Sequence, residues 1–425
     1  MTLALVVGSV FVLLLLRVPV AFALMLPSVM YVVMAEGQTL GVAMQQITSG
    51  VDSFPLLAVP LFIMTGYMAN VSGIADRLFD LLGNLFGTIR GTAGYVNVSG
   101  SVVFSWMSGA AIADAAGLGS LLVPAMRRQG YDAGFAAGLT GASSMIGPVM
   151  PPSIPAIMYA VTAGVSIGAL FFAGIVPAFL LAAVLFVYVF LYARKREDLG
   201  RERPTMAALL SSSVKALPIL FTPVIILGGI LGGVFTPTEA AAAAVMWIVL
   251  MGVAYRSLTV RAFLQTFLKT AQTTGQILLI VAGASLFAWV MARERGPQVL
   301  GDAMFGLTEN PLIFLLLMNV ILLLIGMLIE PVAALLITVP VLLPVAVEFG
   351  VDPVHLGVIM ILNLVIGLLT PPVGLVLYVL SSVTDVDLPT VMRGTMPFLV
   401  PLFVALLLVT FIPQISLFLP QQLGL

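Results

Sequence analysis

The chain has 425 residues, of which 61% are apolar and only 8% are charged, and its mean hydropathy is +1.20. Soluble domains carry charge on about a quarter of their residues, so this composition excludes a soluble globular protein and predicts many membrane spans. The formal net charge of −1 offers no basic surface for nucleic acid. The absence of cysteine excludes disulfides, thiolate metal sites and cysteine nucleophiles.

Long apolar runs follow one another along the chain, and a spanning helix needs about 20 apolar residues. Arg17 follows the first run rather than preceding it, which favours a retained span over a cleaved leader. Two amphipathic segments, 74–90 and 258–270, are typical of helices lying in the membrane interface. Residues 93–127 and 311–349 are apolar but interrupted. Complete spans are predicted at 3–16, 19–35, 55–72, 131–163, 166–192, 213–234, 238–255, 273–292, 354–383 and 395–418.

The distribution of basic residues predicts the orientation, because lysine and arginine concentrate in cytoplasmic loops. We place the N-terminus outside and let 93–127 and 311–349 each enter and leave the membrane on one side. All 17 basic residues except Arg293 and Arg295 then fall in the cytoplasm, including those of the 193–212 loop. The charge distribution therefore predicts two re-entrant hairpins, one from each side of the membrane.

An internal repeat appears when the chain is compared with itself at an offset of 220 residues. Pro124 then meets Pro344, and Gly147 meets Gly367. Pro151 and Pro152 of "MPPS" meet Pro371 and Pro372 of "TPPV" without a gap. The predicted repeats cover 54–165 and 273–384. Their opposite predicted orientations indicate inverted-topology repeats, which are typical of secondary transporters; a duplicated channel or structural bundle is the alternative.

The two proline pairs predict breaks in the spans 131–163 and 354–383. Proline has no N–H to donate to the carbonyl four residues earlier, so the carbonyls of Gly147, Pro148, Gly367 and Leu368 lose their helical partners. Such backbone persists in a membrane only where protein, water or an ion satisfies it. Carbonyl oxygens suit a hard cation such as Na⁺, and the second half-helices, starting near Ser153 and Val373, would favour an anion at their N-termini. Kinks for packing alone are the alternative.

Small residues and two acids mark the expected hairpin tips. Ser108 and Gly109 form the first tip, and Glu330 with Pro331 takes the matching place in the second. Asp114 and Glu330 are intramembrane carboxylates, which are functional by default; the alternative is a structural acid at a helix start. Asp132 and Asp352 each precede a long span and are interpreted as N-caps. The single histidine, His355, is interpreted as structural.

These blocks carry a family resemblance. "SGAAIADAAGLGSLLVPAM", "GASSMIGPVMPPSI", "EPVAALLITVPVLLPVAVEFGVDPVHLGVIMILNLVIGLLTPPVG" and "FPLLAVPLFIMTGYM" resemble the large membrane subunit of tripartite ATP-independent periplasmic (TRAP) transporters over essentially the whole chain. The resemblance implies an all-α polytopic protein with two hairpins and two unwound helices, working as an elevator. It implies Na⁺-driven import of a carboxylate-bearing solute, delivered by a periplasmic binding protein and supported by a small four-helix membrane subunit.

The resemblance also implies sites on this chain. The first sodium site would use Ser108, Gly109, Ser143, Gly147 and Met150, and the second Gly326, Glu330, Asn363, Gly367, Thr370 and Gly374. The substrate would lie between the tips, near Ser108, Ala110, Asp114, Ser153, Pro331 and Val373. Ala110 departs from the serine that many relatives carry. No small-subunit sequence precedes Met1, so a separate partner chain is expected.

The leading hypothesis is a sodium-coupled importer in a bacterial or archaeal inner membrane, and three other functions are alternatives. A stand-alone or proton-coupled carrier of the same elevator class would use Asp114 and Glu330 as proton carriers. An intramembrane hydrolase is disfavoured because the chain lacks GxSxG and has one histidine near a span end. A channel is disfavoured because paired inverted hairpins suit a closed midplane site better than a pore.

Overall fold

The structure is a computed structural model that describes residues 3–35, 39–196, 199 and 204–425. Helices make up the described chain, and eight of them are long and apolar enough to cross a membrane. Part of the predicted cytoplasmic loop 193–212 lies outside the described residues. The chain order is α1 Leu3–Leu15, α2 Val20–Met34, α3 Leu40–Val51, the 3₁₀ turn η1 Phe54–Leu57, α4 Ala58–Val71, α5 Ile74–Phe86, α6 Thr92–Ser108, α7 Ala111–Arg128, α8 Ala133–Ser144, α9 Ile154–Ala163, α10 Ile167–Arg194, α11 Met206–Pro223, the π turn η2 Val224–Gly228, α12 Gly229–Leu231, α13 Pro237–Ala254, α14 Val260–Arg293, α15 Gly296–Leu307, α16 Pro311–Leu328, α17 Pro331–Glu348, α18 Pro353–Gly367, α19 Leu375–Thr384, α20 Leu388–Phe411 and α21 Gln414–Gln422.

The interrupted segments fold as the sequence predicts. Residues 93–127 form the helix pair α6 and α7, which turns at Gly109 with a φ of 63°. Residues 311–349 form the pair α16 and α17. The span 131–163 is divided into α8 and α9, and 354–383 into α18 and α19, with the proline pairs between the halves. Whether the hairpins re-enter the membrane stays a prediction.

Several boundaries differ from the prediction. The amphipathic segment 258–270 and the span 273–292 form one helix, α14, because no proline interrupts them and Thr259 caps the start. The 74–90 segment is helical only to Phe86 in α5, and α11 starts at Met206 instead of 213. The helices α3, α15 and α21 were not predicted, since each is shorter than a span and none stands out by hydropathy.

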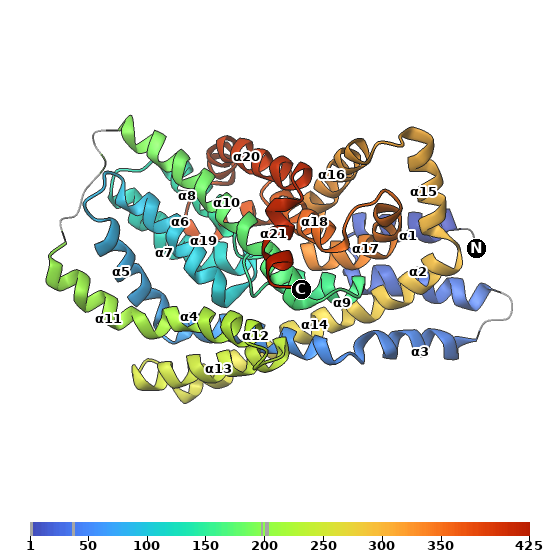
Figure 1. Ribbon diagram of the computed structural model, residues 1–425, viewed down its shortest axis with the longest axis horizontal. Helices are drawn as coiled ribbons and strands as arrows, with labels where there is room; N and C mark the ends of the chain where they lie inside the picture. Colours follow the sequence, from blue (N-terminus) through green and yellow to red (C-terminus); the bar gives the residue numbers. More distant parts are fainter. Residues whose placement is uncertain (1–2, 36–38, 197–198, 200–203) are drawn as a thin grey trace.

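The two repeats exchange the second halves of their broken helices. The second half of the first broken helix, α9, packs against α17 of the second hairpin, while α19 packs against α7 of the first hairpin. The helices that follow each repeat do the same, because α20 lies against α8 and α10 contacts α18. Figure 1 shows the two hairpins toward opposite ends of the long axis, with α9 and α18 between them. The core therefore belongs to both repeats together.

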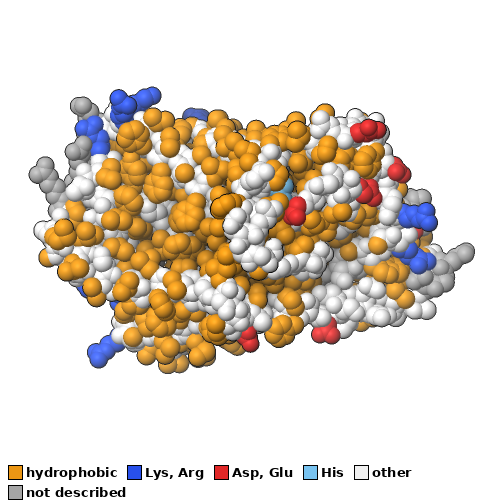
Figure 2. Space-filling view, in the orientation of Figure 1, with side chains coloured by type: hydrophobic (Ala, Val, Ile, Leu, Met, Phe, Trp, Pro, Cys, Tyr) orange, Lys and Arg blue, Asp and Glu red, His pale blue; other side chains and the backbone are white. Residues whose placement is uncertain are grey.

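The surface matches a lipid environment. Figure 2 shows a face that is mostly apolar, with lysine and arginine side chains toward the two ends of the long axis. Large apolar side chains such as Leu15, Leu217 and Val400 are more than 60% exposed, which in water would be a large uncompensated apolar surface. The chain is a multi-pass membrane protein.

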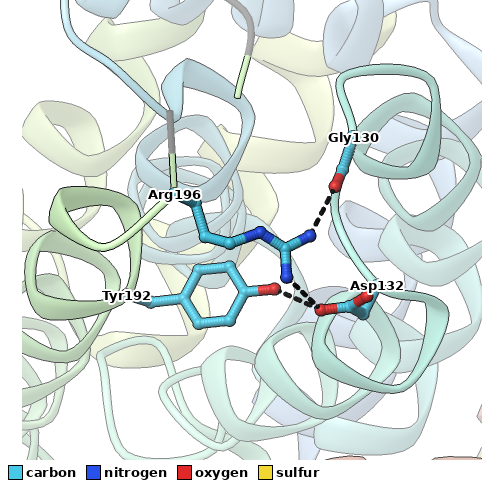
Figure 3. Close-up of polar contacts among 4 residues, drawn as sticks. All are labelled: Gly130, Asp132, Tyr192 and Arg196. Atoms are coloured by element: carbon cyan, nitrogen blue, oxygen red, sulfur yellow. Dashed lines mark hydrogen bonds and ion pairs between the residues drawn. The ribbon is translucent and has the colours of Figure 1, made fainter. Parts of the chain in front are cut away.

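Polar contacts fix the turn between α7 and α8 (Figure 3). Asp132 Oδ2 accepts hydrogen bonds from the Tyr192 hydroxyl at 2.6 Å and from Arg196 Nη1 at 2.9 Å, while Arg196 Nη2 donates to the Gly130 carbonyl at 3.1 Å. The bonds from Tyr192 and Arg196 lower the pKa of Asp132 below its usual 3.8. The predicted cap at Asp352 is confirmed by its bonds to Val354 N and His355 N. Asp132 takes the N-cap position of α8, but its side chain makes no cap bond there and instead accepts a hydrogen bond from Tyr192 of α10.

Glycines let α8 and α20 touch backbone to backbone. A β-carbon built at Gly138 would overlap the Gly394 carbonyl, and one built at Gly394 would overlap the Gly134 carbonyl. Small residues four apart allow this approach in membrane helices.

We expect Gly138→Ala and Gly275→Ala to have opposite effects on thermal stability. At Gly138 the methyl group must separate two helices, so we expect a loss of about 2–3 kcal/mol, the usual cost of overpacking. At Gly275, inside α14, a β-carbon meets nothing within 4 Å, so alanine should be neutral or gain up to about 1 kcal/mol through helix propensity. Melting of the purified variants in detergent would measure both; equal losses would contradict the close α8–α20 contact.

Candidate functional site

A cavity of about 460 Å³ lies between the two hairpin tips. The first tip contributes Ser108 to Ala113 and the second Glu330 to Ala333, and both breaks reach the wall through Pro148 and Leu368. The opposite wall comes from α4 and α14. The remaining lining residues are Val20, Ile63, Gly66, Tyr67, Asn70, Ile154, Pro155, Thr273, Gln276, Ile277 and Ile280.

Three helix N-termini converge on this cavity. The first residues of α7 (Ala111 to Ala113), α9 (Ile154 and Pro155) and α17 (Pro331 to Ala333) all line it. Each N-terminus carries partial positive charge, although Pro155 in α9 and Pro331 in α17 have no N–H group to offer. Ser153 caps α9 and Glu330 caps α17, through bonds from Ala156 N and Ala333 N. At α7 the cap position is Ala110, whose side chain caps nothing, and the acid of the first turn, Asp114, lies outside the cavity lining, so the first N–H groups of α7 have no side-chain cap and face the cavity.

The substrate prediction is met in part by position. Ser108, Ala110 and Pro331 line the cavity, whereas Asp114, Ser153 and Val373 do not. Ser153 is engaged behind the wall, where its hydroxyl donates to the Pro148 carbonyl and caps α9. The start of α19 near Val373 also lies outside the cavity. The N-terminus that lines the cavity from the second repeat is that of α17. These roles in binding stay predictions.

The first predicted ion site is compact around the break. A β-carbon built at Gly109 would lie 2.5 Å from the Pro152 carbonyl oxygen, so the first tip touches the unwound link directly. Gly147 faces Asp114 so closely that a β-carbon would overlap its Oδ2. Met150 is buried nearby in sequence. Ser143 lies one turn earlier, and its hydroxyl donates to Asn97 Oδ1 at 2.8 Å and accepts from Ser101 at 2.8 Å.

Asp114 is fully buried, and within the described chain neither of its carboxyl oxygens has a hydrogen-bond partner of good geometry. The hydroxyl of Ser108, across the hairpin, is its polar neighbour. A buried carboxylate without partners is costly, so Asp114 either keeps its proton or faces a cation.

The second predicted ion site is built alike. Gly326 packs onto α18 so tightly that a β-carbon would lie 2.7 Å from the Leu364 carbonyl oxygen, and one at Gly367 would lie 2.6 Å from the Gly326 carbonyl carbon. Asn363 donates to Asn319 Oδ1 at 2.7 Å, which leaves its own buried Oδ1 without a partner among the described residues. Thr370 donates to the Ile366 carbonyl, and Gly374 has a φ of 45°.

The carbonyls expected to be free are in part satisfied locally. Gly367 O accepts from Thr370 N at 2.9 Å, Leu368 O from Val376 N at 3.1 Å, and Pro148 O from the Ser153 hydroxyl. Each carbonyl retains a second lone pair, so these bonds orient the oxygens without saturating them. The links are therefore rigid and still able to offer ligands.

Sequence reasoning missed the wall formed by α4 and α14. Tyr67, Asn70, Thr273 and Gln276 supply most of the polar side chains around the cavity. Tyr67 falls inside the motif that carried the family resemblance, and Thr273 and Gln276 are polar residues three apart at the start of the predicted span 273–292. Helical spacing could have placed Thr273 and Gln276 on one helix face. It could not have shown that this face turns toward the hairpin tips.

We expect Ala110→Ser to raise the stability of the empty protein by about 1 kcal/mol, because a serine at this position caps the exposed N–H groups of α7. Ala115→Ser is the matched control: Ala115 is buried inside the same helix, where a hydroxyl gains no cap and should destabilise. Thermal melting of both variants measures the difference. A destabilised Ala110→Ser protein would mean that the α7 N-terminus already has partners.

Comparison with known proteins bears on the role of this cavity. Residues 7–415 match the family model described as the tripartite ATP-independent periplasmic transporter, DctM component. The chain is 44% identical to the sialic acid TRAP transporter large permease protein SiaM of Vibrio cholerae, over 98% of both chains. It is 39% identical to the C4-dicarboxylate TRAP transporter large permease protein DctM of Pseudomonas aeruginosa over 88% of each chain. It is 38% identical to the sialic acid TRAP transporter permease protein SiaT of Haemophilus influenzae, over 96% of this chain and 66% of that protein.

Solved structures agree on the fold. The YdaH transporter of Alcanivorax borkumensis superposes with a TM-score of 0.67 over 93% of this chain and 97% of that one, at 15% identity. MtrF of Neisseria gonorrhoeae, described as an antimetabolite efflux pump, gives 0.55 over 87% and 83%, also at 15% identity. With the family match over nearly its whole length, the chain belongs to the DctM component family of TRAP transporters and is a large membrane permease subunit, a transporter rather than an enzyme.

Proposed function

We propose that this subunit carries out sodium-coupled import of a small organic acid across a bacterial inner membrane. The observation that carries the proposal is the cavity closed by both hairpin tips, with three helix N-termini turned toward it. A volume of about 460 Å³ lies within the range of small-molecule sites. The relatives named for sialic acid and C4-dicarboxylate support the substrate class.

Helix N-termini supply the attraction for the acid. Among the described lining residues Glu330 is the only charged one, and its carboxylate is engaged at the start of α17. A carboxylate substrate would therefore bind to uncapped N–H groups of α7 and to neutral hydroxyl and amide side chains. Backbone N–H groups at a helix start are a general anion site.

Sodium would balance the charge of the acid at the two breaks. The first site would use the Pro152 carbonyl, Ser108 and the partnerless carboxylate of Asp114, which the hairpin tip brings against the link. The second would use the link after Gly367 with the free Oδ1 of Asn363. Hard oxygen ligands of this kind suit a hard cation. Coupling follows, because ions that order the tips complete the cavity for the substrate.

The exchanged packing of the repeats supports an elevator movement, in which the hairpins and broken helices travel as one body against the remaining spans. A periplasmic binding protein would deliver the acid and a small membrane subunit would brace the scaffold, as the family name and the longer SiaT relative support. We place the N-terminus on the periplasmic side and the 193–212 loop in the cytoplasm.

The first test is thermal unfolding of the purified chain in NaCl against equal KCl or choline chloride. An ion that binds only the folded state stabilises it by about 2.7 kcal/mol at a hundredfold excess over Kd, so we expect a sodium-specific rise in melting temperature. Asp114→Asn should melt at or above the wild-type temperature without sodium, because a buried partnerless acid is removed, and should lose part of the sodium-specific rise.

Asp132→Asn is the matched control, since it removes an acid that lies outside both breaks and should keep the full sodium response. A full response in Asp114→Asn would exclude that carboxylate as a ligand. If the wild type shows no sodium-specific gain but loses stability as the pH rises, because buried acids must then give up their protons, coupling runs on protons through Asp114 and Glu330, which is the alternative proposal. Uptake of sialic acid or succinate into proteoliposomes with a sodium gradient then tests the substrate class.

A topology test uses the absence of cysteine in the chain. A single cysteine placed beside Arg295 should react with a membrane-impermeant maleimide in intact cells. One placed beside Arg127 should react only when the reagent reaches the cytoplasmic side, because the inverted-repeat orientation separates these two loops. Labelling from the same side would contradict the proposed inverted topology.

A further inference from the structure

An anion that reaches the cavity must first pass its mouth, and the exposure of the lining residues shows where this mouth lies. Asn70 at the end of α4 and Gln276 on α14 are exposed, whereas the deeper lining residues Ser108, Pro155 and Ala333 are buried. Neither exposed residue carries a charge. The cavity therefore opens along α4 and α14, and its lining holds no lysine or arginine among the described residues.

One cation stands beside this mouth. Lys269 lies one turn before Thr273 and two turns before Gln276 on α14, so the three residues share a helix face. The Lys269 ammonium lies 4.7 Å from the centre of the Tyr67 ring. Tyr67 lines the cavity, and its hydroxyl is hydrogen-bonded to Thr273 Oγ1 at 3.1 Å.

These contacts hold the charge in place at the lip. A cation over a tyrosine ring is attracted to its face, and the bond between Tyr67 and Thr273 ties that ring to the same helix. Lys269 itself is exposed, and its ammonium lies over a ring that lines the cavity. The 4.7 Å from the ammonium to the ring centre is shorter than the screening length of about 8 Å at physiological ionic strength, so the potential of Lys269 reaches this part of the cavity wall.

We infer that Lys269 is a positioning and selectivity residue that favours small organic anions over cations at this mouth, which the predicted orientation places on the cytoplasmic side, where an importer releases its solute. Lys269 lies at the exposed end of the cavity, beside neutral lining side chains, while the helix N-termini lie deeper inside. An electrostatic funnel of this kind raises the local concentration of an anion without holding it tightly. This inference rests on the proposed transport of organic acids, but its test needs no transport.

The test places one thiol in the mouth. Gln276→Cys introduces the only cysteine of the chain. Its reaction rate is measured with two reagents of similar size, the negative sulfonatoethyl and the positive trimethylammonioethyl methanethiosulfonate, on the purified full chain at low salt. The ratio of the two rates cancels any change in thiolate fraction, because both reagents attack the same thiolate. We expect Lys269→Gln to lower the negative-to-positive ratio about threefold to tenfold and Lys269→Arg to preserve it.

Arg261→Gln is the matched control, since Arg261 is an exposed cation two turns earlier on α14 but has no place beside Tyr67. It should leave the ratio nearly unchanged. An unchanged ratio in Lys269→Gln would overturn the inference, and so would an equal fall in Arg261→Gln, because the field would then be that of the whole surface.

Uptake separates this inference from the proposed function. In proteoliposomes loaded with sialic acid or succinate, counterflow by Lys269→Gln should need several-fold more solute for half-saturation and should keep the maximal rate. If the wild-type protein carries neither acid, the proposed substrate class is refuted. The ratio of the two methanethiosulfonate rates still tests the role of Lys269 in that case. Wild-type transport with an unaltered Lys269→Gln variant would overturn the inference alone.

Discussion

The constraint behind this architecture is that a helix cannot be interrupted in apolar surroundings without new partners for its backbone. Each proline pair removes helical hydrogen bonds where water is scarce. Nearby donors replace some of them. The Pro148 carbonyl accepts from the Ser153 hydroxyl, that of Gly367 from Thr370 N, and that of Leu368 from Val376 N. The hairpin tips then pack against the links through glycines. The position of every group around the cavity depends on this repair, because it fixes where each half-helix begins.

The two breaks are equivalent in sequence but not in surroundings. Residues 145–153 are wholly buried, whereas Pro372 is exposed and its neighbours are half-buried. The first link is therefore enclosed by its hairpin and Asp114, and the second has an open side. The proposed inverted topology predicts such a difference, because two halves that face opposite sides of the membrane are exposed unequally in any one conformation.

The sequence was sufficient for the features governed by covalent chemistry and periodicity. Proline pairs at a common offset predicted both breaks, and the small residues at Ser108 and Gly109 predicted the first tip. The sequence was insufficient where tertiary contacts decide. Asp132 fits the pattern of a cap, yet Tyr192 and Arg196 lie 60 and 64 residues away and take its carboxylate. Likewise the sequence could not show that Ser143 is hydrogen-bonded to Asn97 and Ser101, and its role as an ion ligand stays a prediction.

The exchange of broken helices between the repeats has a consequence for biosynthesis. One partner of α7 is α19, which begins about 250 residues after α7 ends. At the usual pace of about 5–20 residues per second, the ribosome needs tens of seconds to deliver it. Throughout that interval the side of α7 that α19 will cover is without this partner. The nascent chain must therefore tolerate an unfinished half, and its native core closes only when nearly all of it has left the ribosome.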